Sequence, residues 1–542
     1  MKIVLLITGL FIILPFFPDA QTVERSLNNN KWEFKKTGES LCFPAKIPGT
    51  VHTDLFANGL IPDPFAGDNE KKLQWIENED WVYRTNFNIS SSEIQKGHIE
   101  LKFEALDTYA KIFMNDSLVG TADNMFRIWK MNVKPFVKEG ENKLTMQFTS
   151  SVRRGKELAK QLPYTLPGDE KVFTRKAQYQ YGWDWGPRFV TCGIGDVKLV
   201  SWNKARISQI QSHQELKGDS LAELEFICTV FSDSILDTKI NLVHHTGNLF
   251  YDRIEKKIRL FPGENRIQIK YSIPKPELWW SNGLGAAHLY VFGFYLSLGK
   301  NDLLFEEVPL DFKSISIGIR TIELVQKTDS MGSSFYFKLN GVPVFMKGAN
   351  YIPPDNFLNR VRITDYQSII KNAAEANMNM LRVWGGGVYA DDAFYQACDE
   401  NGILVWQDFM FACAMYPGDR YFVENVSAEI TDQVQGLRNH PCIALWCGNN
   451  EIDEGWKNWG WQNQYHYSFA DSSKIESDYQ TMFEKQIKNI LLKEDPGRPY
   501  WPSSPSIGWG HGESLKQGDS HYWGIWWDWN HLKCTKKSLA DS

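Results

Sequence analysis

The stretch CIALWCGNNE, residues 442–451, is a short apolar run followed by a glycine, two amides and a glutamate. A run of this length that is bounded by turn residues is typical of a strand buried on both faces. Such strands occur in parallel sheets whose faces are covered by helices. The stretch therefore predicts a parallel strand whose C-terminal end presents Asn450 and Glu451.

The same kind of segment recurs on both sides of this stretch. Further short strands are predicted at 340–351, 378–387, 403–409, 499–505 and 519–523, and segments with helical periodicity lie between them. Strand–helix alternation at this spacing predicts a (β/α)₈ barrel over residues 323–542. Only six strands are found, and the segment after Trp527 has no buried-strand pattern. We therefore expect an incomplete TIM barrel that contains strands one to six.

The first 322 residues follow a different pattern. Trp81, Tyr83, Thr85, Phe87 and Ile89 alternate with polar residues, and similar alternation recurs up to about residue 200, which predicts an antiparallel β-sandwich over 21–200. Short alternating strands over 201–322 have the length of an immunoglobulin-like β-sandwich. The chain is thus predicted to be multidomain.

The N-terminus and the composition limit the classes of function. Residues 1–20 have Lys2, an apolar run, a breaker and Ala20, which predicts a signal peptide and export, with no membrane anchor. A formal net charge of −6 does not favour a nucleic-acid partner. The eight Cys residues form no C-x-x-C pair and the sequence has no P-loop and no H-E-x-x-H motif, so neither a metal site nor a cofactor is predicted.

Polar side chains follow five of the six predicted barrel strands, at the end where the active sites of this fold lie. They are Asn350, Arg382 with Trp384, Asp408, Asn450 with Glu451, and His521. Glu451 directly follows its strand, and we expect desolvation to raise its pKa as a general acid requires. Asp453 and Glu454 are expected to be solvated loop charges.

The segment YGWDWGPR, residues 181–188, places Trp183 and Trp185 on either side of Asp184 and encloses them between glycines and a proline. This composition predicts a loop. It is either a packed aromatic corner or a sugar-contacting loop that reaches from the first domain toward the barrel.

The chain resembles glycoside hydrolase family 2, in its β-mannosidase branch. The resemblance rests on YGWDWGPR and on KIPGTVHTDL, WIENEDWVYR, FMKGANYIPPD, ALWCGNNE and GDSHYWG. It implies a jelly-roll-like sugar-binding first domain and a retaining exo-β-mannosidase that releases terminal non-reducing β-D-mannose from oligosaccharides.

The resemblance also implies roles for individual residues. Glu451 would be the acid/base. The substrate-binding set would be Asp184, Trp183, Arg382, Trp384, Asn450, Trp459, His521 and Trp523. Members of the family carry the nucleophile Glu after strand seven, and this sequence has no matching segment, so the nucleophile is expected to be absent from the chain. Two alternatives stay open: a non-catalytic carbohydrate-binding protein, and a family 2 enzyme for another β-glycoside.

Overall fold

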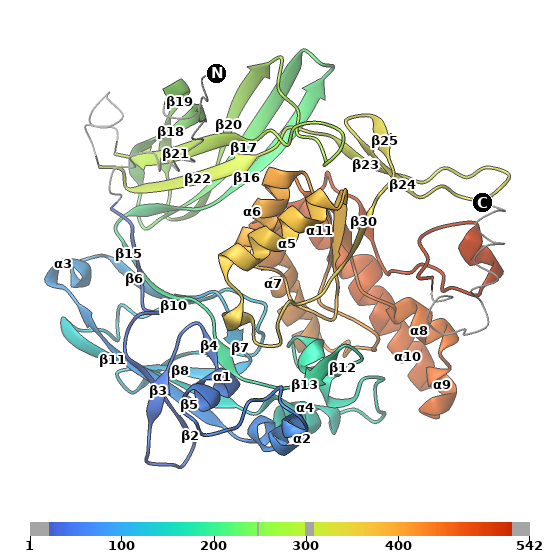
Figure 1. The fold of residues 1–542 in the computed structure, drawn as a ribbon. Coiled ribbons are helices and arrows are strands. Elements are labelled where there is room, and N and C mark those ends of the chain that lie inside the picture. The colour runs from blue at the N-terminus through green and yellow to red at the C-terminus, as the bar shows by residue number, and fades with distance from the viewer. Residues whose placement is uncertain (1–20, 247–248, 299–307, 523–542) are drawn as a thin grey trace, which may run out of the picture.

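The structure is a computed structural model that describes residues 21–522, except 247–248 and 299–307. The predicted signal peptide and Trp523 lie outside the described residues. Figure 1 shows an N-terminal part in blue, a second β-rich part in green, and a helix-rich part in orange and red that contacts the N-terminal part.

The N-terminal part is built from antiparallel sheets around one apolar core, as the alternation predicts. A four-stranded sheet has the order β1-β15-β6-β10, with bounds Val23–Ser26, Val197–Trp202, His98–Phe103 and Trp129–Asn132. A six-stranded sheet has the order β3-β2-β5-β11-β8-β9, with bounds Phe43–Ala45, Trp32–Lys36, Trp81–Ile89, Gly140–Thr149, Tyr109–Met114 and Ser117–Ala122. Side chains on one face of β5 are buried and those on the other face are mostly exposed.

The second part contains two facing antiparallel sheets with their own core. One has the order β16-β17-β20, with bounds Ala205–Lys217, Leu221–Ser232 and Gly263–Pro274. The other has the order β19-β18-β21-β22, with bounds Leu249–Leu260, Leu236–Thr246, Tyr290–Ser297 and Asp311–Ile317. Two aligned sheets of this kind are the architecture of an immunoglobulin-like sandwich.

The third part contains a five-stranded parallel sheet with the sequential order β26-β27-β28-β29-β30. The bounds are Gly348–Tyr351, Met380–Val383, Leu404–Asp408, Ile443–Cys447 and Tyr500–Trp501. Every residue of β28 and β29 is buried, as expected for strands covered on both faces. The prediction from CIALWC is therefore confirmed.

Two predicted barrel strands differ in the structure. Residues 340–351 form two strands: β25 (Val342–Val344) pairs antiparallel with β24 (Tyr336–Leu339), and β26 follows after a break. Both halves carry apolar residues, so the sequence pattern alone does not reveal the change of partner. Residues 519–522 adopt no strand, and the rest of the predicted sixth strand lies outside the described residues.

Helices connect the parallel strands. They are α5 (Ile363–Glu375), α6 (Asp392–Asn401), α7 (Arg420–Leu437), α8 (Ile452–Asn458), α9 (Trp461–Gln464), α10 (Phe469–Tyr479) and α11 (Ile487–Glu494). Helix α6 has Asp391 as its N-cap and ends at Gly402, which has a φ of +67°, a value that glycine adopts without strain. In the described part of the chain no helix is long and apolar enough to cross a bilayer.

Candidate active site

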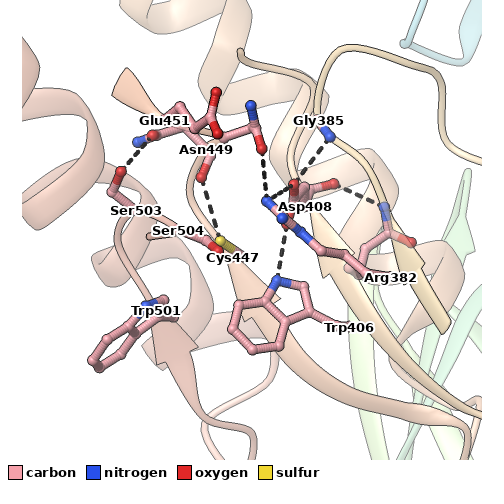
Figure 2. Close-up of polar contacts among 12 residues, drawn as sticks. Arg382, Gly385, Trp406, Asp408, Cys447, Asn449, Glu451, Trp501, Ser503 and Ser504 are labelled. Atoms are coloured by element: carbon pink, nitrogen blue, oxygen red, sulfur yellow. Dashed lines mark hydrogen bonds and ion pairs between the residues drawn. The ribbon is translucent and has the colours of Figure 1, made fainter. Parts of the chain in front are cut away.

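The candidate site lies where β27, β28, β29 and β30 end, at the C-terminal edge of the parallel sheet. Two isolated parallel bridges, Ala412 to Asn450 and Asn450 to Ser504, extend the pairing beyond the strands. They fix the spacing of the loops that follow. Figure 2 shows the side chains from these strand ends converging on one another.

Asp408 is fully buried and its carboxylate is held on several sides. Arg382 donates to it twice, with Nε 3.2 Å from Oδ1 and Nη2 2.8 Å from Oδ2. The backbone N–H of Gly385 and the indole N–H of Trp406 also donate to it, at 3.0 and 2.9 Å (Figure 2). A bidentate pair of this kind fixes the plane of the guanidinium group. Arg382 is therefore rigidly placed below the site.

The remaining donors of Arg382 connect it to two predicted site residues. Its Nη2 lies 3.0 Å from Oδ1 of Asn450, and its Nη1 lies 3.0 Å from Nε2 of His521. The Nδ1 of His521 lies 2.7 Å from Oε1 of Glu451. Arg382, Asn450, His521 and Glu451 therefore form one continuous network, although residues 519–522, which include His521, adopt no strand.

Glu451 takes its position from backbone geometry. It is the N-cap of α8, has a φ of +59°, and donates its N–H to the carbonyl of Ser504 at 2.8 Å. A non-glycine residue in this left-handed region is strained, and the surrounding contacts must hold it there. Asp453 pairs with Lys457, and Glu454 accepts from Asn458 on the same helix, so neither is part of the network.

The expected rise in the pKa of Glu451 is wrong for this structure. Burial raises the pKa of the carboxyl group, but hydrogen bonds and charge from His521, with smaller effects of Cys413 and Arg382, outweigh burial and lower it. None of these three residues is near Glu451 in the sequence, so their effect on its pKa could not be predicted from the local sequence. A second carboxylate nearby would act in the opposite direction, because like charges disfavour ionisation.

An aromatic cluster flanks this network and is shared between the N-terminal part and the parallel sheet. Trp183 lies on β12 (Tyr181–Trp183), which forms a hairpin with β13 (Gly186–Arg188). Its ring packs edge-on against Trp384 with centroids 4.7 Å apart, and Trp185 packs against Trp384 at 5.8 Å. The YGWDWGPR segment therefore does reach from the N-terminal part to the parallel sheet.

The other predicted site residues are less tightly placed. Asp184 is exposed at the tip of the β12–β13 hairpin, and among the described residues no hydrogen bond joins it to the network. Trp459 ends α8, is 44% exposed and packs edge-on against Trp461. Asn350 is exposed on β26. Trp523 lies outside the described residues.

Sequence reasoning missed three residues of the network. The sulfur of Cys413 lies 3.3 Å from Oε2 of Glu451 and 3.3 Å from Nδ2 of Asn450. The hydroxyl of Ser504 lies 3.1 Å from Nε2 of His521, and it donates to Asp519 at 2.5 Å. Ser504 and Asp519 lie within predicted strands five and six, and this position is a weak indication of a place in the site. Cys413 lies in the loop after strand three, and nothing in the sequence pattern indicated its role.

One group within the described residues could in principle hold a metal ion: Asp399, His440 and Cys442. The carboxylate of Asp399 already lies 2.6 Å from Nδ1 of His440 and accepts the backbone N–H of Cys442 at 2.9 Å. These contacts satisfy the carboxylate without an ion. The group lies outside the network of Glu451.

A family model described as "Glycosyl hydrolase 2 galactose-binding domain-like" matches residues 32–196. Among curated proteins, the chain is 34% identical to "Beta-mannosidase" of Rattus norvegicus over 92% of this chain, and 36% identical to "Beta-mannosidase" of Bos taurus over 90% of it. It is also 34% identical to "Beta-mannosidase B" of Emericella nidulans over 91% of it. The chain spans only 58%, 56% and 59% of the lengths of these three relatives.

Two solved structures resemble this chain to different degrees. A β-D-mannosidase from Dictyoglomus thermophilum matches with a TM-score of 0.85 and 39% identity, covering 94% of this chain and 60% of that one. An exo-chitosanase from Amycolatopsis orientalis matches with a TM-score of 0.68 and 18% identity, covering 89% of this chain and 53% of that one, and this likeness concerns the fold alone.

Proposed function

The chain belongs to glycoside hydrolase family 2 and is related to its β-mannosidases, and from this premise we propose that it acts as a retaining exo-β-mannosidase on terminal non-reducing β-D-mannose. The observation that carries the proposal is the network at the strand ends. There Glu451 stands beside Asn450, Arg382 and His521, next to an aromatic cluster suited to a sugar ring.

Glu451 is the proposed acid/base. It would protonate the glycosidic oxygen as the bond breaks and then take a proton from the attacking water. Its carboxylate is partly exposed, with 14% of the side chain accessible, so a substrate can reach it. His521 and Cys413 hold the two carboxylate oxygens in a fixed direction.

Retaining hydrolysis needs a second carboxylate about 5 Å from the first. Within residues 21–522, the neighbouring Asp408 and Asp519 are both occupied by hydrogen-bond donors. Asp408 accepts from Arg382, Trp406 and Gly385, and Asp519 accepts from Trp501, Ser504 and Ser506. Neither is free to attack a sugar, so we assign the nucleophile to no described residue.

The remaining site residues are proposed to bind the sugar. Asn450, fixed by Arg382, would contact the 2-hydroxyl group, and Trp384 with Trp183 would form the wall of the mannose subsite. Asp184 would bind the terminal mannose from the hairpin. Trp459 would lie nearer the leaving-group side, and His521, which contacts Arg382 and Glu451, would belong with Trp523 to the substrate-binding set.

We also propose the division into domains at 21–200, 201–322 and 323–542, with a jelly-roll-like first domain and a TIM barrel of which the described residues form part. Export by a signal peptide at residues 1–20 belongs to the same proposal.

The test is hydrolysis of aryl β-D-mannoside by this chain and its Glu451→Gln variant. Loss of the acid/base is expected to reduce turnover by a factor on the order of 10² to 10⁴, because general acid–base catalysis contributes that much. Where a nucleophile is supplied and the activated leaving group needs no proton, azide should displace that nucleophile from the mannosyl intermediate of Glu451→Ala and give a β-mannosyl azide. Unchanged turnover of Glu451→Gln would remove the assignment.

A second candidate, carbohydrate binding without hydrolysis, is favoured by the occupied carboxylates of Asp408 and Asp519. Calorimetry with a mannoside decides between the two. Heat of binding without turnover supports the second candidate, and the same titration with a β-galactoside and a β-glucosaminide tests the identity of the sugar.

A further inference from the structure

Cys413 touches both polar residues that end β29. Its S–H donates to Oε2 of Glu451, and its sulfur accepts from Nδ2 of Asn450, each at 3.3 Å. Its backbone N–H donates to the carbonyl of Asn450 at 2.9 Å. The residue is therefore attached to Asn450 through both its backbone and its side chain.

The backbone of Cys413 is held in the left-handed region, with a φ of +47°. For a residue with a side chain this conformation costs of order 1–3 kcal/mol and persists only where surrounding contacts enforce it. Glu451, its partner, also has a positive φ. Two strained residues whose side chains meet indicate that the contact between them is built into both loops.

Cys413 also differs from most other cysteines in the described residues. Cys192, Cys228, Cys398, Cys442 and Cys447 are buried, whereas Cys42 and Cys413 are partly exposed. Cys42 lies in the N-terminal part, away from the network. Cys413 is therefore the partly exposed thiol that contacts the candidate site.

We propose that Cys413 is a positioning residue for Glu451: its thiol holds Oε2 of the carboxylate while its sulfur holds the amide of Asn450, so that the two groups meet the sugar at a fixed separation. The contact itself stands on geometry alone. Its catalytic meaning rests on the proposed function of Glu451.

The contact with Glu451 affects the pKa of the Cys413 thiol. Burial raises the pKa of Cys413 well above its ordinary value, and the charge and hydrogen bond of Glu451 raise it further. Removing the carboxylate charge should lower the pKa and increase the thiolate fraction, which is the reactive form. Alkylation by iodoacetamide reports this fraction, because the thiolate forms the S–C bond as iodide leaves and the thiol proton goes to solvent.

The first experiment measures the alkylation rate of each cysteine by mass spectrometry in the wild-type chain and in Glu451→Gln. We expect Cys413 to react at least about threefold faster in the variant, since each unit of pKa is a tenfold change in thiolate. Cys42 in the same sample should react equally in both chains. Glu454→Gln, which removes a carboxylate outside the network, should leave the Cys413 rate unchanged. An equal Cys413 rate in the wild-type chain and in Glu451→Gln would overturn the proposal.

Buried Cys447 controls for opening of the site, because its labelling would show that the variant has unfolded locally. If Cys447 is labelled, the variants Cys413→Ser and Cys413→Ala test the proposal instead. Serine keeps a donor and an acceptor at this position, and alanine keeps neither.

Because the Cys413 hydrogen bond lowers the pKa of Glu451, its loss should shift the pH profile of mannoside hydrolysis to higher pH. We expect that shift, with about a tenfold loss of kcat/KM, in Cys413→Ala, since one lost hydrogen bond to a charged group has about that effect. Cys413→Ser should retain the wild-type profile. An unshifted profile in Cys413→Ala would contradict positioning. Absence of any wild-type hydrolysis would count against the proposed function only, and the alkylation rates would still decide the contact.

Discussion

Arg175 and Glu429 form a bidentate ion pair in the contact between the N-terminal part and helix α7, with Nη2 2.7 Å from Oε1 and Nε 2.8 Å from Oε2. Their side chains are 2% and 0% exposed. Tyr389 and Asn124 also donate to the same carboxylate, at 3.0 and 2.9 Å. All of its hydrogen-bonding capacity is therefore used inside the protein.

Replacing Glu429 with Gln should destabilise the chain by about 3–5 kcal/mol, because it leaves the charge of Arg175 buried without a partner. Glu424→Gln on the same helix is the matched control, since Glu424 pairs with Arg420 in solvent. Urea unfolding curves of the two variants measure the difference. Equal midpoints would show that the buried pair has no special weight.

Stability should also depend on the ionisation of His440. Burial opposes its charged form, but hydrogen bonds to Asp392 and Asp399 outweigh burial and raise its pKa to about 9 from the ordinary 6.5. A raised pKa stabilises the folded state fully below about pH 6.5, and the contribution is lost as the pH rises through about 9. The expected loss between these limits is about 3 kcal/mol.

Unfolding free energies at pH 6 and pH 10 measure this dependence. In His440→Gln the difference between the two pH values should shrink by the contribution of this residue, whereas His511→Gln, on an exposed loop, should keep the wild-type difference. If the difference in unfolding free energy between pH 6 and pH 10 were unchanged in His440→Gln, the pH dependence would belong to another group.

Asp184 provides a test of binding that is separate from stability. It is exposed, so Asp184→Asn should leave the melting temperature unchanged. We expect it to weaken mannoside binding about tenfold, the effect of losing one hydrogen bond to a charged group. Asp116→Asn is the matched control, because Asp116 is an exposed aspartate in the turn between β8 and β9. Calorimetric titration that gives equal affinities for both variants would remove Asp184 from the subsite.

Alanine substitutions at two glycines test whether the aromatic wall of Trp183 and Trp384 is needed for mannoside binding. A Cβ at Gly386 would lie 1.9 Å from the ring of Trp384, whereas a Cβ at Gly436 on α7 would meet no atom within 4 Å. Gly386→Ala should therefore displace Trp384 and abolish mannoside binding. Gly436→Ala should leave binding intact and stabilise the chain by about 0.5–1 kcal/mol, because alanine is the better helix former. Binding retained in Gly386→Ala would show that the wall is not needed.

The strands of the parallel sheet could be predicted because their signal is local. CIALWC and ILVWQDF are apolar on both faces, and both form buried parallel strands. The positions of Arg382, Asn450 and Glu451 then follow, since parallel strands bring their C-terminal ends to one edge. Residues 340–351 failed the same reasoning, because an apolar pattern does not tell which partner strand it pairs with.

The contacts that set the chemistry of Glu451 could not be predicted, because they join residues distant in the sequence. His521 is 70 residues away and Cys413 is 38 residues away. The expectation of a raised pKa considered only the neighbours of Glu451 along the chain, and His521 reversed it. The ion pair between Arg175 and Glu429 joins residues 254 positions apart, so it could not be predicted from the local sequence either.

The packing of Trp183 on Trp384 joins two parts of the chain at the proposed sugar-binding wall. One ring comes from the β12–β13 hairpin and the other follows β27, about two hundred residues later in the chain. The mannose subsite proposed above would therefore require both parts. It would form only after both had folded and docked, so measured sugar binding would also report correct folding of the whole chain.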